Sequence, residues 1–247
     1  MKALRWSFAF ALLASFAAVP ASAATLDLSG TIRDFHSTHP NMEYVINGVE
    51  TGIVLPGLGA DGTPDFNAAT TAKSVTNAAD FADWYHNVVG VNSSAPFSIS
   101  LTEGAPGVFS YSNGDFFPID GLLFGNEGYS HNYHFTVDLH KPFVYQAGQY
   151  LNAAADDDLW VFINGQLALD VGGVHSTAGG SINLDTLGLV AGQTYDLDIF
   201  FAERHTVAST FSVETNIKCV PEPTTAGLAL LGAAGLGLCA WRRRRAS

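Results

Sequence analysis

The chain has 247 residues, of which 23 are acidic and 11 basic, so its formal net charge at pH 7 is −12. This acidity opposes binding to nucleic acid and anionic lipid, and it suits cations, neutral polymers or a secreted protein that only needs solubility. The two cysteines, Cys219 and Cys239, both lie near the C-terminus, so the body of the chain has neither a disulfide framework nor a thiolate metal site.

The first 23 residues have the pattern of a secretory signal peptide. Lys2 and Arg5 precede an apolar run over residues 6–19, and residues 21–23 (Ala-Ser-Ala) are the small residues that signal peptidase accepts. We therefore expect residues 1–23 to be removed on export and the mature domain to begin at residue 24.

Strand patterns dominate residues 24–219. Segments rich in β-branched and aromatic residues are separated at short intervals by Gly, Asn, Asp and Pro. The predicted strands span residues 26–35, 97–101, 133–139, 143–150, 159–163, 166–170, 194–201 and 210–217. Many short strands with turn signals between them predict an all-β fold, either a β-sandwich or a jelly-roll-like barrel.

Two segments depart from the strand pattern. Residues 77–88 place large apolar side chains three and four positions apart, which predicts one helix. Residues 41–76 are rich in Gly, Pro, Ala and Thr and show little periodicity, so we expect a long surface loop there.

A hairpin is predicted after the acidic run at residues 156–158. Residues 159–163 are apolar at every position, as in a strand covered on both faces, and the Asn-Gly pair at 164–165 favours a two-residue type I′ turn. That turn pairs Ile163 with Gln166, and it would therefore place Leu159 opposite Asp170. Asp170 then joins the acidic run at the open end of the hairpin, with His175 a few residues further along.

The carboxylates gathered there predict a calcium site formed by Asp156, Asp157, Asp158 and Asp170. Like charges destabilise one another unless a cation compensates, and calcium takes about six to eight oxygen ligands in flexible geometry. Neighbouring residues of a strand point to opposite faces, so Asp156 and Asp157 reach one ion only if a bulge or a cis peptide bends the chain. The alternative is that the aspartates cap a turn and face solvent.

The C-terminal tail has three parts. Val220, Pro221, Glu222 and Pro223 are followed by the uncharged segment 224–241 and then by four arginines. The apolar segment is long enough for a transmembrane helix, and the arginines would remain cytoplasmic. The tail resembles the PEP-CTERM sorting signal of Gram-negative bacteria.

This resemblance implies processing by an exosortase near the Val-Pro-Glu-Pro motif, in cells that make exopolysaccharide, so the helix would be a transient anchor. Removing both ends leaves residues 24–219 as one domain. That domain keeps 22 of the 23 acidic residues and five of the 11 basic ones, so its formal charge is −17.

Longer motifs of the domain resemble the fibro-slime family over roughly residues 31–217. They are "TIRDFHSTHP" (31–40), "DFFPIDG" (115–121), "HNYHFT" (131–136), "DDDLWVFINGQLALDVGGVH" (156–175) and "IFFAERHTVASTFSVETN" (199–216). The resemblance implies the β-sandwich of anthrax protective antigen, whose lectin members include yeast flocculins. In those lectins two consecutive aspartates joined by a cis peptide bind calcium, which in turn holds sugar hydroxyls.

The resemblance assigns this aspartate pair to Asp156 and Asp157. It also implies further calcium ligands from the loop at residues 203–209, where Glu203 is the candidate ligand. Arg204 and His205 of that loop, together with His175, are candidates for contacting the sugar. Ala155 stands where glycine commonly precedes the aspartates, so it would strain the chain if that position needs a positive φ.

Together these features predict a secreted, non-enzymatic, calcium-dependent protein that binds extracellular polysaccharide or another glycan and adheres to the matrix. One alternative is a structural matrix protein whose calcium site only stabilises the fold. Another is a glycoside hydrolase that pairs Glu203 with Asp156 or Asp170. Two histidine pairs, 36/39 and 131/134, have a spacing that separates side chains on a strand, so we expect them to be hydrogen-bonded in loops.

Overall fold

The computed structural model describes residues 24–218. The predicted signal peptide, the sorting motif and the predicted helix at residues 224–241 lie outside these residues. Within residues 24–218 no helix has both the length and the apolar character needed to cross a bilayer.

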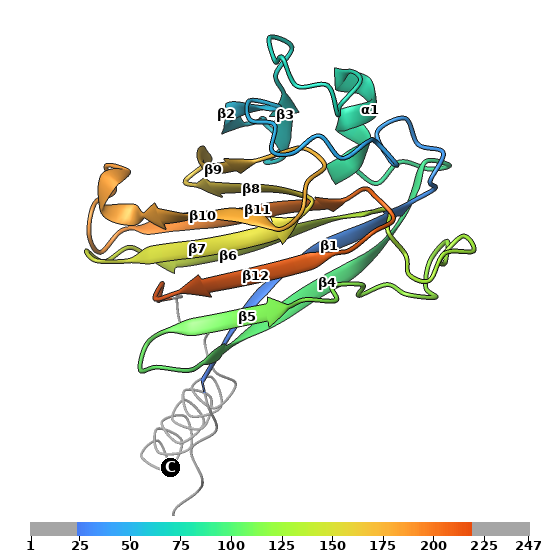
Figure 1. The fold of residues 1–247 in the computed structure, drawn as a ribbon. Helices are drawn as coiled ribbons and strands as arrows, with labels where there is room; N and C mark the ends of the chain where they lie inside the picture. The colour runs from blue at the N-terminus through green and yellow to red at the C-terminus, as the bar shows by residue number, and fades with distance from the viewer. Residues whose placement is uncertain (1–23, 219–247) are drawn as a thin grey trace, which may run out of the picture.

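Twelve strands of residues 24–218 form one antiparallel sheet, so the predicted all-β fold is confirmed (Figure 1). The strands are β1 (Thr25–Phe35), β2 (Val54–Leu58), β3 (Pro64–Phe66), β4 (Asn92–Glu103), β5 (Phe109–Asn113), β6 (Phe135–Val144), β7 (Tyr150–Asp156), β8 (Asp158–Ile163), β9 (Gln166–Val171), β10 (Ala178–Asn183), β11 (Thr194–Glu203) and β12 (Thr210–Thr215). Their order across the sheet is β10-β7-β12-β5-β4-β1-β6-β11-β8-β9-β2-β3.

The sheet curls around one large apolar core. Its inner face contributes alternate residues of nearly every strand, such as Leu151 of β7, Val213 of β12, Val161 of β8 and Ile199 of β11. The curl brings β9 and β10 into contact, although eight other strands of the described residues separate them in the sheet order. The two halves of the sheet therefore face each other across the core, as in a β-sandwich.

A second, smaller core covers part of the outer face. The short helix α1 (Ala78–Ala82) and the 3₁₀ turn η1 (Asp83–Tyr85) pack there. Their side chains Phe81 and Trp84 pack against Trp160 of β8 and Phe200 of β11. All six residues of β8 are consequently buried, which confirms that this strand is covered on both faces.

Several predicted boundaries are wrong for local reasons. Residues 143–150 do not form one strand, because the chain turns at Gly148, whose φ is +84°, and so ends β6 and begins β7. The predicted helix ends at Tyr85 because the backbone becomes extended at His86. The expected loop at residues 41–76 contains β2 and β3, and strands β5 and β10 had no prediction.

The acidic hairpin has the predicted turn but a different register. Ile163 pairs with Gln166 as expected, yet a bulge at Ala168 shifts the pairing, so that Asp170 lies opposite Trp160 and not Leu159. The predicted pairing of Leu159 with Asp170 is therefore wrong. The bulge moves Asp170 one step away from the acidic run.

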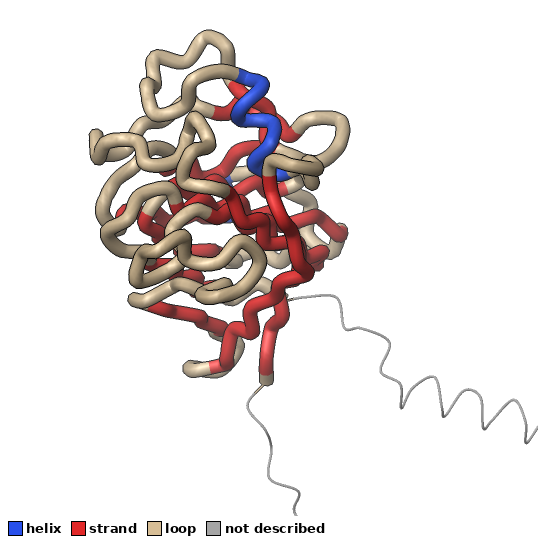
Figure 2. Tube along the Cα trace, turned by 90° about the vertical axis from the view of Figure 1, so that its right-hand side faces the viewer, coloured by secondary structure: helices blue, strands red, loops and turns tan. Residues whose placement is uncertain are grey.

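The long loops gather at one end of the sheet. β7 and β11 both end there and β8 begins there, at the right-hand side of Figure 1, which faces the viewer in Figure 2. The acidic run between β7 and β8 is thereby surrounded by loops from distant parts of the chain.

Candidate metal and ligand site

The pairing of β8 with β11 determines which acidic side chains meet. Asp158 pairs with Ala202, so the next positions outward are Asp157 and Glu203. Side chains alternate between the two faces of a sheet, so Asp157 and Glu203 point to one side and their neighbours to the other. This register brings together residues that are 46 positions apart in the sequence.

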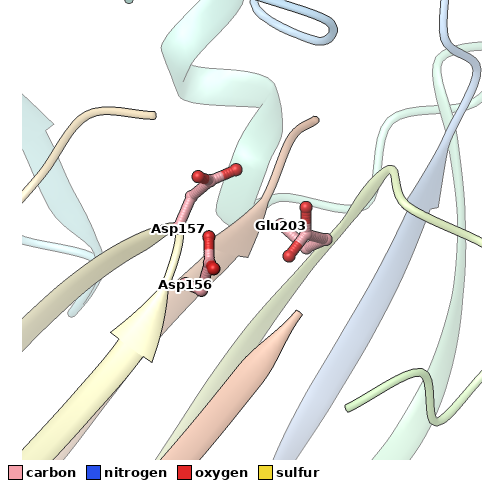
Figure 3. Close-up of side chains that lie close together, drawn as sticks. All are labelled: Asp156, Asp157 and Glu203. Atoms are coloured by element: carbon pink, nitrogen blue, oxygen red, sulfur yellow. The ribbon is translucent and has the colours of Figure 1, made fainter. Parts of the chain in front are cut away.

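Asp156, Asp157 and Glu203 form a compact carboxylate cluster. One carboxylate oxygen from each lies within 4.8 Å of the others, and Figure 3 shows the three side chains at the adjoining ends of β7, β8 and β11. Asp157 and Glu203 are buried, with 2% and 0% exposure, while Asp156 is partly buried. The peptide bond between Asp156 and Asp157 is cis, which is one of the two predicted geometries.

Backbone donors hold two of these carboxylates in place. Asp157 Oδ1 accepts from the His175 N–H at 2.9 Å, and its Oδ2 accepts from the Arg204 N–H at 3.1 Å. Glu203 Oε1 accepts from the His205 N–H at 3.1 Å. Glu203 Oε2 is buried without a hydrogen-bond partner among the described residues. The cluster thus retains buried acceptor capacity for a ligand.

Burial makes negative charge costly in this cluster. Removal from water, reinforced by the nearby charge of Asp158, raises the pKa of Asp157 to about 8. Burial also raises the pKa of Asp156, and it raises the pKa of Glu203 well above its usual range. A bound cation would favour the ionised form of all three groups. Three carboxylates are oxygen donors of the kind that calcium prefers, so these residues fit that ion.

Arg204 has a structural role, so its predicted contact with a sugar is wrong. Its side chain is 0% exposed, and its Nε donates to Asp158 Oδ2 at 2.6 Å. The Nη atoms donate to Asp158 Oδ1, to the carbonyls of Asn41 and Ser74, and to the Ser74 hydroxyl. The guanidinium also lies 4.8 Å from the centre of the Trp84 ring. All five of its N–H donors are therefore occupied.

Asp158 and Asp170 lie outside the carboxylate cluster. Asp158 is 0% exposed and faces Arg204, while its Oδ1 also accepts from the Gly173 N–H. Asp170 accepts from Trp160 Nε1 at 3.0 Å and from the Gly52 N–H at 2.7 Å. The structure thus separates the four predicted aspartate ligands into one pair at the cluster and two that fasten the surrounding chain.

A small pocket of about 160 Å³ opens beside Asp156 and Asp157. His175 and His205, which were predicted to contact the sugar, both line this pocket, and Ile46 and Val207 contribute apolar side chains. His205 Nδ1 lies 3.5 Å from Glu43 Oε2, and His175 is buried. The contribution of Ile46 had no sequence signal, because it comes from a loop more than 100 residues away in the chain.

Two glycines let that distant loop cross the site. A Cβ atom on Gly172 would lie 2.8 Å from the Glu50 carbonyl, and one on Gly173 would lie 2.8 Å from the Gly48 carbonyl. Instead, the Glu50 N–H donates to the Gly172 carbonyl at 2.6 Å, and the N–H groups of Asn47 and Gly48 donate to Val174. The sequence "VGGVH" therefore admits a close backbone crossing, which positions the Ile46 side of the pocket.

The remaining predicted residues have ordinary surroundings. His36, His131 and His134 each lie 2.7 Å from a loop carboxylate, as expected for hydrogen-bonded loop histidines. His39 lies 3.7 Å from Asp83. Ala155 is a buried strand residue outside the positive-φ region, so it introduces no strain before the aspartates.

Two family models match the chain. Residues 125–223 match the PA14 domain, and residues 220–245 match the PEP-CTERM protein-sorting motif. The first match contains the carboxylate cluster and most of its pocket. Part of the all-β fold is therefore similar to the PA14 domain, and the match to the sorting motif implies export to the bacterial cell envelope. The broader fibro-slime assignment stays a prediction.

The psi proteins of Dictyostelium discoideum are homologues of the chain. Protein psiD is 39% identical over 210 residues, which cover 79% of this chain and 41% of psiD. Protein psiR is 40% identical over 215 residues, which cover 79% of this chain and 22% of psiR. The chain thus spans less than half the length of these relatives.

Solved structures of PA14 domains show a looser similarity. The PA14 sugar-binding domain from an RTX adhesin is 20% identical, with a TM-score of 0.27, over 35% of this chain and 48% of that one. The PA14 domain of the MpAFP antifreeze protein is 12% identical, with a TM-score of 0.32, over 80% of this chain and 85% of that one. Similarity at this level carries no functional argument.

Proposed function

We propose that this protein is an exported, calcium-dependent carbohydrate-binding module that attaches to extracellular polysaccharide. The observation that carries the proposal is the cluster of Asp156, Asp157 and Glu203, whose buried oxygens include one without a hydrogen-bond partner among the described residues. The match of residues 125–223 to the PA14 domain supports this class of function, because PA14 domains are of the carbohydrate-binding or adhesion type.

In this proposal each residue at the site has a distinct role. Asp156, Asp157 and Glu203 hold calcium, which would supply a positive centre for sugar hydroxyls at the mouth of the pocket. His175 and His205 shape the pocket, and Ile46 and Val207 offer apolar surface to a sugar ring. Asp158 and Arg204 fix the backbone behind the cluster, so the carboxylates keep their arrangement.

The PEP-CTERM motif supports the cellular part of the proposal. It implies that an exosortase processes the chain near Val220–Pro223 after export. We infer that residues 224–241 anchor the precursor in the inner membrane until then, with the arginines on the cytoplasmic side. The mature domain would then act at the envelope or in an exopolysaccharide matrix, which has the neutral polymers that its acidity tolerates.

Calorimetric titration of the full chain with calcium tests the metal site. We expect binding by the wild-type protein and at least tenfold weaker binding by Asp156→Ala, Asp157→Ala and Glu203→Gln, because each change removes a ligand. Glu214→Gln, an exposed substitution on β12, is the matched control and should bind normally. Absence of calcium binding by the wild-type protein would end the proposal.

A glycan array, read with calcium and with a chelator, tests the carbohydrate part. Binding that requires both calcium and Asp157 supports the proposed function. If calcium binds but no calcium-dependent glycan signal appears, the site only stabilises the fold, as in a structural matrix protein. Turnover of a polysaccharide that depends on Glu203 would instead indicate a glycoside hydrolase.

A further inference from the structure

A second candidate binding site lies on the outer face of the sheet. An open groove of about 760 Å³ crosses β1, β6 and β11, and this volume lies within the range of about 300–1,000 Å³ typical of ligand sites. Two polar side chains from each strand line it: Thr31, Arg33, Asp138, His140, Asp196 and Asp198. The turn between β2 and β3 and the segment after η1 also border the groove. A contact of 2.9 Å between Asp61 Oδ2 of the turn and His86 Nε2 of the segment connects the two.

A connected set of polar contacts orders the floor of the groove. Asp138 Oδ1 accepts from the Thr31 N–H at 2.8 Å, and Asp138 Oδ2 forms an ion pair with Arg33. His140 places Nε2 3.2 Å from Asp138 Oδ1 and Nδ1 2.8 Å from Asp198 Oδ1. His140 therefore positions two carboxylates at once, and the floor has a fixed arrangement before any ligand arrives.

Stability alone does not explain charges at these positions. Arg33, Asp138 and Asp198 are only 6%, 5% and 8% exposed. Replacing buried ion pairs with apolar residues is often neutral or stabilising. On the same outer face, Trp160 and Phe162 form an apolar core where α1 and η1 cover the sheet. The change from apolar to charged residues coincides with the groove, as expected if the charges serve a ligand.

The balance of charge limits the class of ligand. Four aspartates line the groove, at positions 61, 138, 196 and 198. Hydrogen bonds to Asp138 and Asp198 raise the pKa of His140 to about 9, so its imidazole is cationic at neutral pH and adds to the charge of Arg33. The carboxylates still outnumber these two cations, so the groove disfavours polyanions. Carboxylates also form strong charge-assisted hydrogen bonds with hydroxyl groups.

We propose that this groove binds a neutral saccharide chain without a metal ion. Asp196 and Asp198 accept hydrogen bonds from sugar hydroxyls, and the side-chain amide of Asn87 donates to the sugar because its Oδ1 already accepts from Arg33 Nε at 2.9 Å. Asp198 and Glu203 are five residues apart on β11, or about 17 Å, and point to opposite faces. The groove is thus separate from the carboxylate cluster, and its binding does not depend on the function proposed for that cluster.

The test is calorimetry of the full chain in EDTA with cellohexaose, maltohexaose, mannohexaose and hexagalacturonate as probes. We expect at least one neutral hexasaccharide to bind and the anionic hexagalacturonate not to bind. Asp196→Asn should weaken the neutral binding about tenfold, because it removes a charged acceptor. Asp27→Asn, an exposed change on β1 outside the groove lining, and Asp157→Asn in the carboxylate cluster should leave it unchanged.

His140→Gln tests the positioning role. Saccharide binding by the wild-type protein should vary with pH between about 7 and 9, where His140 titrates. His140→Gln should weaken this binding and remove its pH dependence, whereas Asp196→Asn should retain the pH dependence. Thermal unfolding of every variant checks that the fold is intact. The proposal is overturned if no neutral hexasaccharide binds in EDTA, if hexagalacturonate binds instead, or if the binding disappears in Asp157→Asn but persists in Asp196→Asn.

Discussion

At the scale of single residues, the site depends on alternation along two paired strands. Asp157 and Glu203 point to the carboxylate cluster, while their neighbours Asp158 and Arg204 point to the opposite side and pair with each other. The pattern of the sequence could not show which of the three consecutive aspartates pairs with Arg204, because Arg204 lies 46 residues after Asp158. The family resemblance did separate them, since it assigned the calcium pair to Asp156 and Asp157.

The pairing of Asp158 with Arg204 leads to a prediction about stability. Arg204→Met leaves the carboxylate of Asp158 buried without its cation, so we expect the free energy of unfolding to fall by about 3–5 kcal/mol. Urea unfolding followed by circular dichroism measures this loss. The double variant Asp158→Asn/Arg204→Met should recover part of it, since the buried charge is gone. A double variant no more stable than the single one would contradict this account.

His140 leads to a prediction about pH. Its pKa is raised from 6.5 to about 9, first by the hydrogen bond to Asp138 and then by that to Asp198. A histidine whose pKa is higher in the folded state contributes stability that is complete below about pH 6.5 and is lost as pH rises through 9. In His140→Gln, the free energy of unfolding should therefore vary less between pH 6 and pH 9 than in the wild type. Parallel curves for the two proteins would show that the imidazole is not the titrating group.

At the scale of elements, the sequence predicted those turns and strands whose formation depends on neighbouring residues alone. The Asn-Gly turn, the fully buried strand after the acidic run and the strands at both ends of the domain follow from spacing and turn chemistry. The bulge at Ala168 did not, because "QLALD" contains neither glycine nor proline to indicate it. Strand β10 was missed for the opposite reason, since "AGGSIN" has the composition of a turn and becomes a strand only by pairing with β7.

The backbone crossing at the glycine pair gives a prediction at this scale. Gly173 has a φ of +99° and lies against Gly48, so Gly173→Ala combines backbone strain with a steric clash. We expect a loss of about 1–3 kcal/mol in stability and faster hydrogen exchange at the amides of Asn47 and Glu50. Gly62→Ala is the matched control, because φ is +84° there but no described atom lies within 4 Å of the added Cβ. Equal hydrogen exchange in the two variants would argue against the crossing.

At the scale of the whole molecule, the curled sheet assembles a site that no single segment contains. The cluster takes Asp156 and Asp157 from the β7–β8 junction and Glu203 from β11, and the loop carrying Ile46 closes the pocket. Composition and strand spacing predicted the fold class, because they show which segments are apolar enough to be buried and where turns separate the strands. They could not predict the strand order, because pairings such as β1 with β6 join residues more than 100 positions apart.

The net charge of the domain leads to the last prediction, which concerns calcium and global stability. The domain has 22 acidic and five basic residues between positions 24 and 219, so its negative charges repel one another and destabilise the folded state. The three carboxylates of the buried cluster contribute part of this repulsion. A ligand present at 100 times its Kd stabilises the folded state by about 2.7 kcal/mol, which for a domain of this size raises Tm by about 5–10 °C. We expect calcium to raise Tm by this amount and magnesium to raise it less, because magnesium demands stricter geometry.

The Glu203→Gln variant distinguishes the effect of bound calcium on stability from the effect of repulsion between the carboxylates. The amide keeps an acceptor for the His205 N–H and replaces the unpartnered oxygen with a donor beside Asp156 and Asp157. In EDTA this variant should therefore unfold at a higher temperature than the wild type, and calcium should raise its Tm by about half as much as in the wild type, or less. Differential scanning calorimetry in EDTA and in calcium measures both effects. A variant that is less stable than the wild type in EDTA, yet stabilised by calcium as much as the wild type, would place the cation elsewhere.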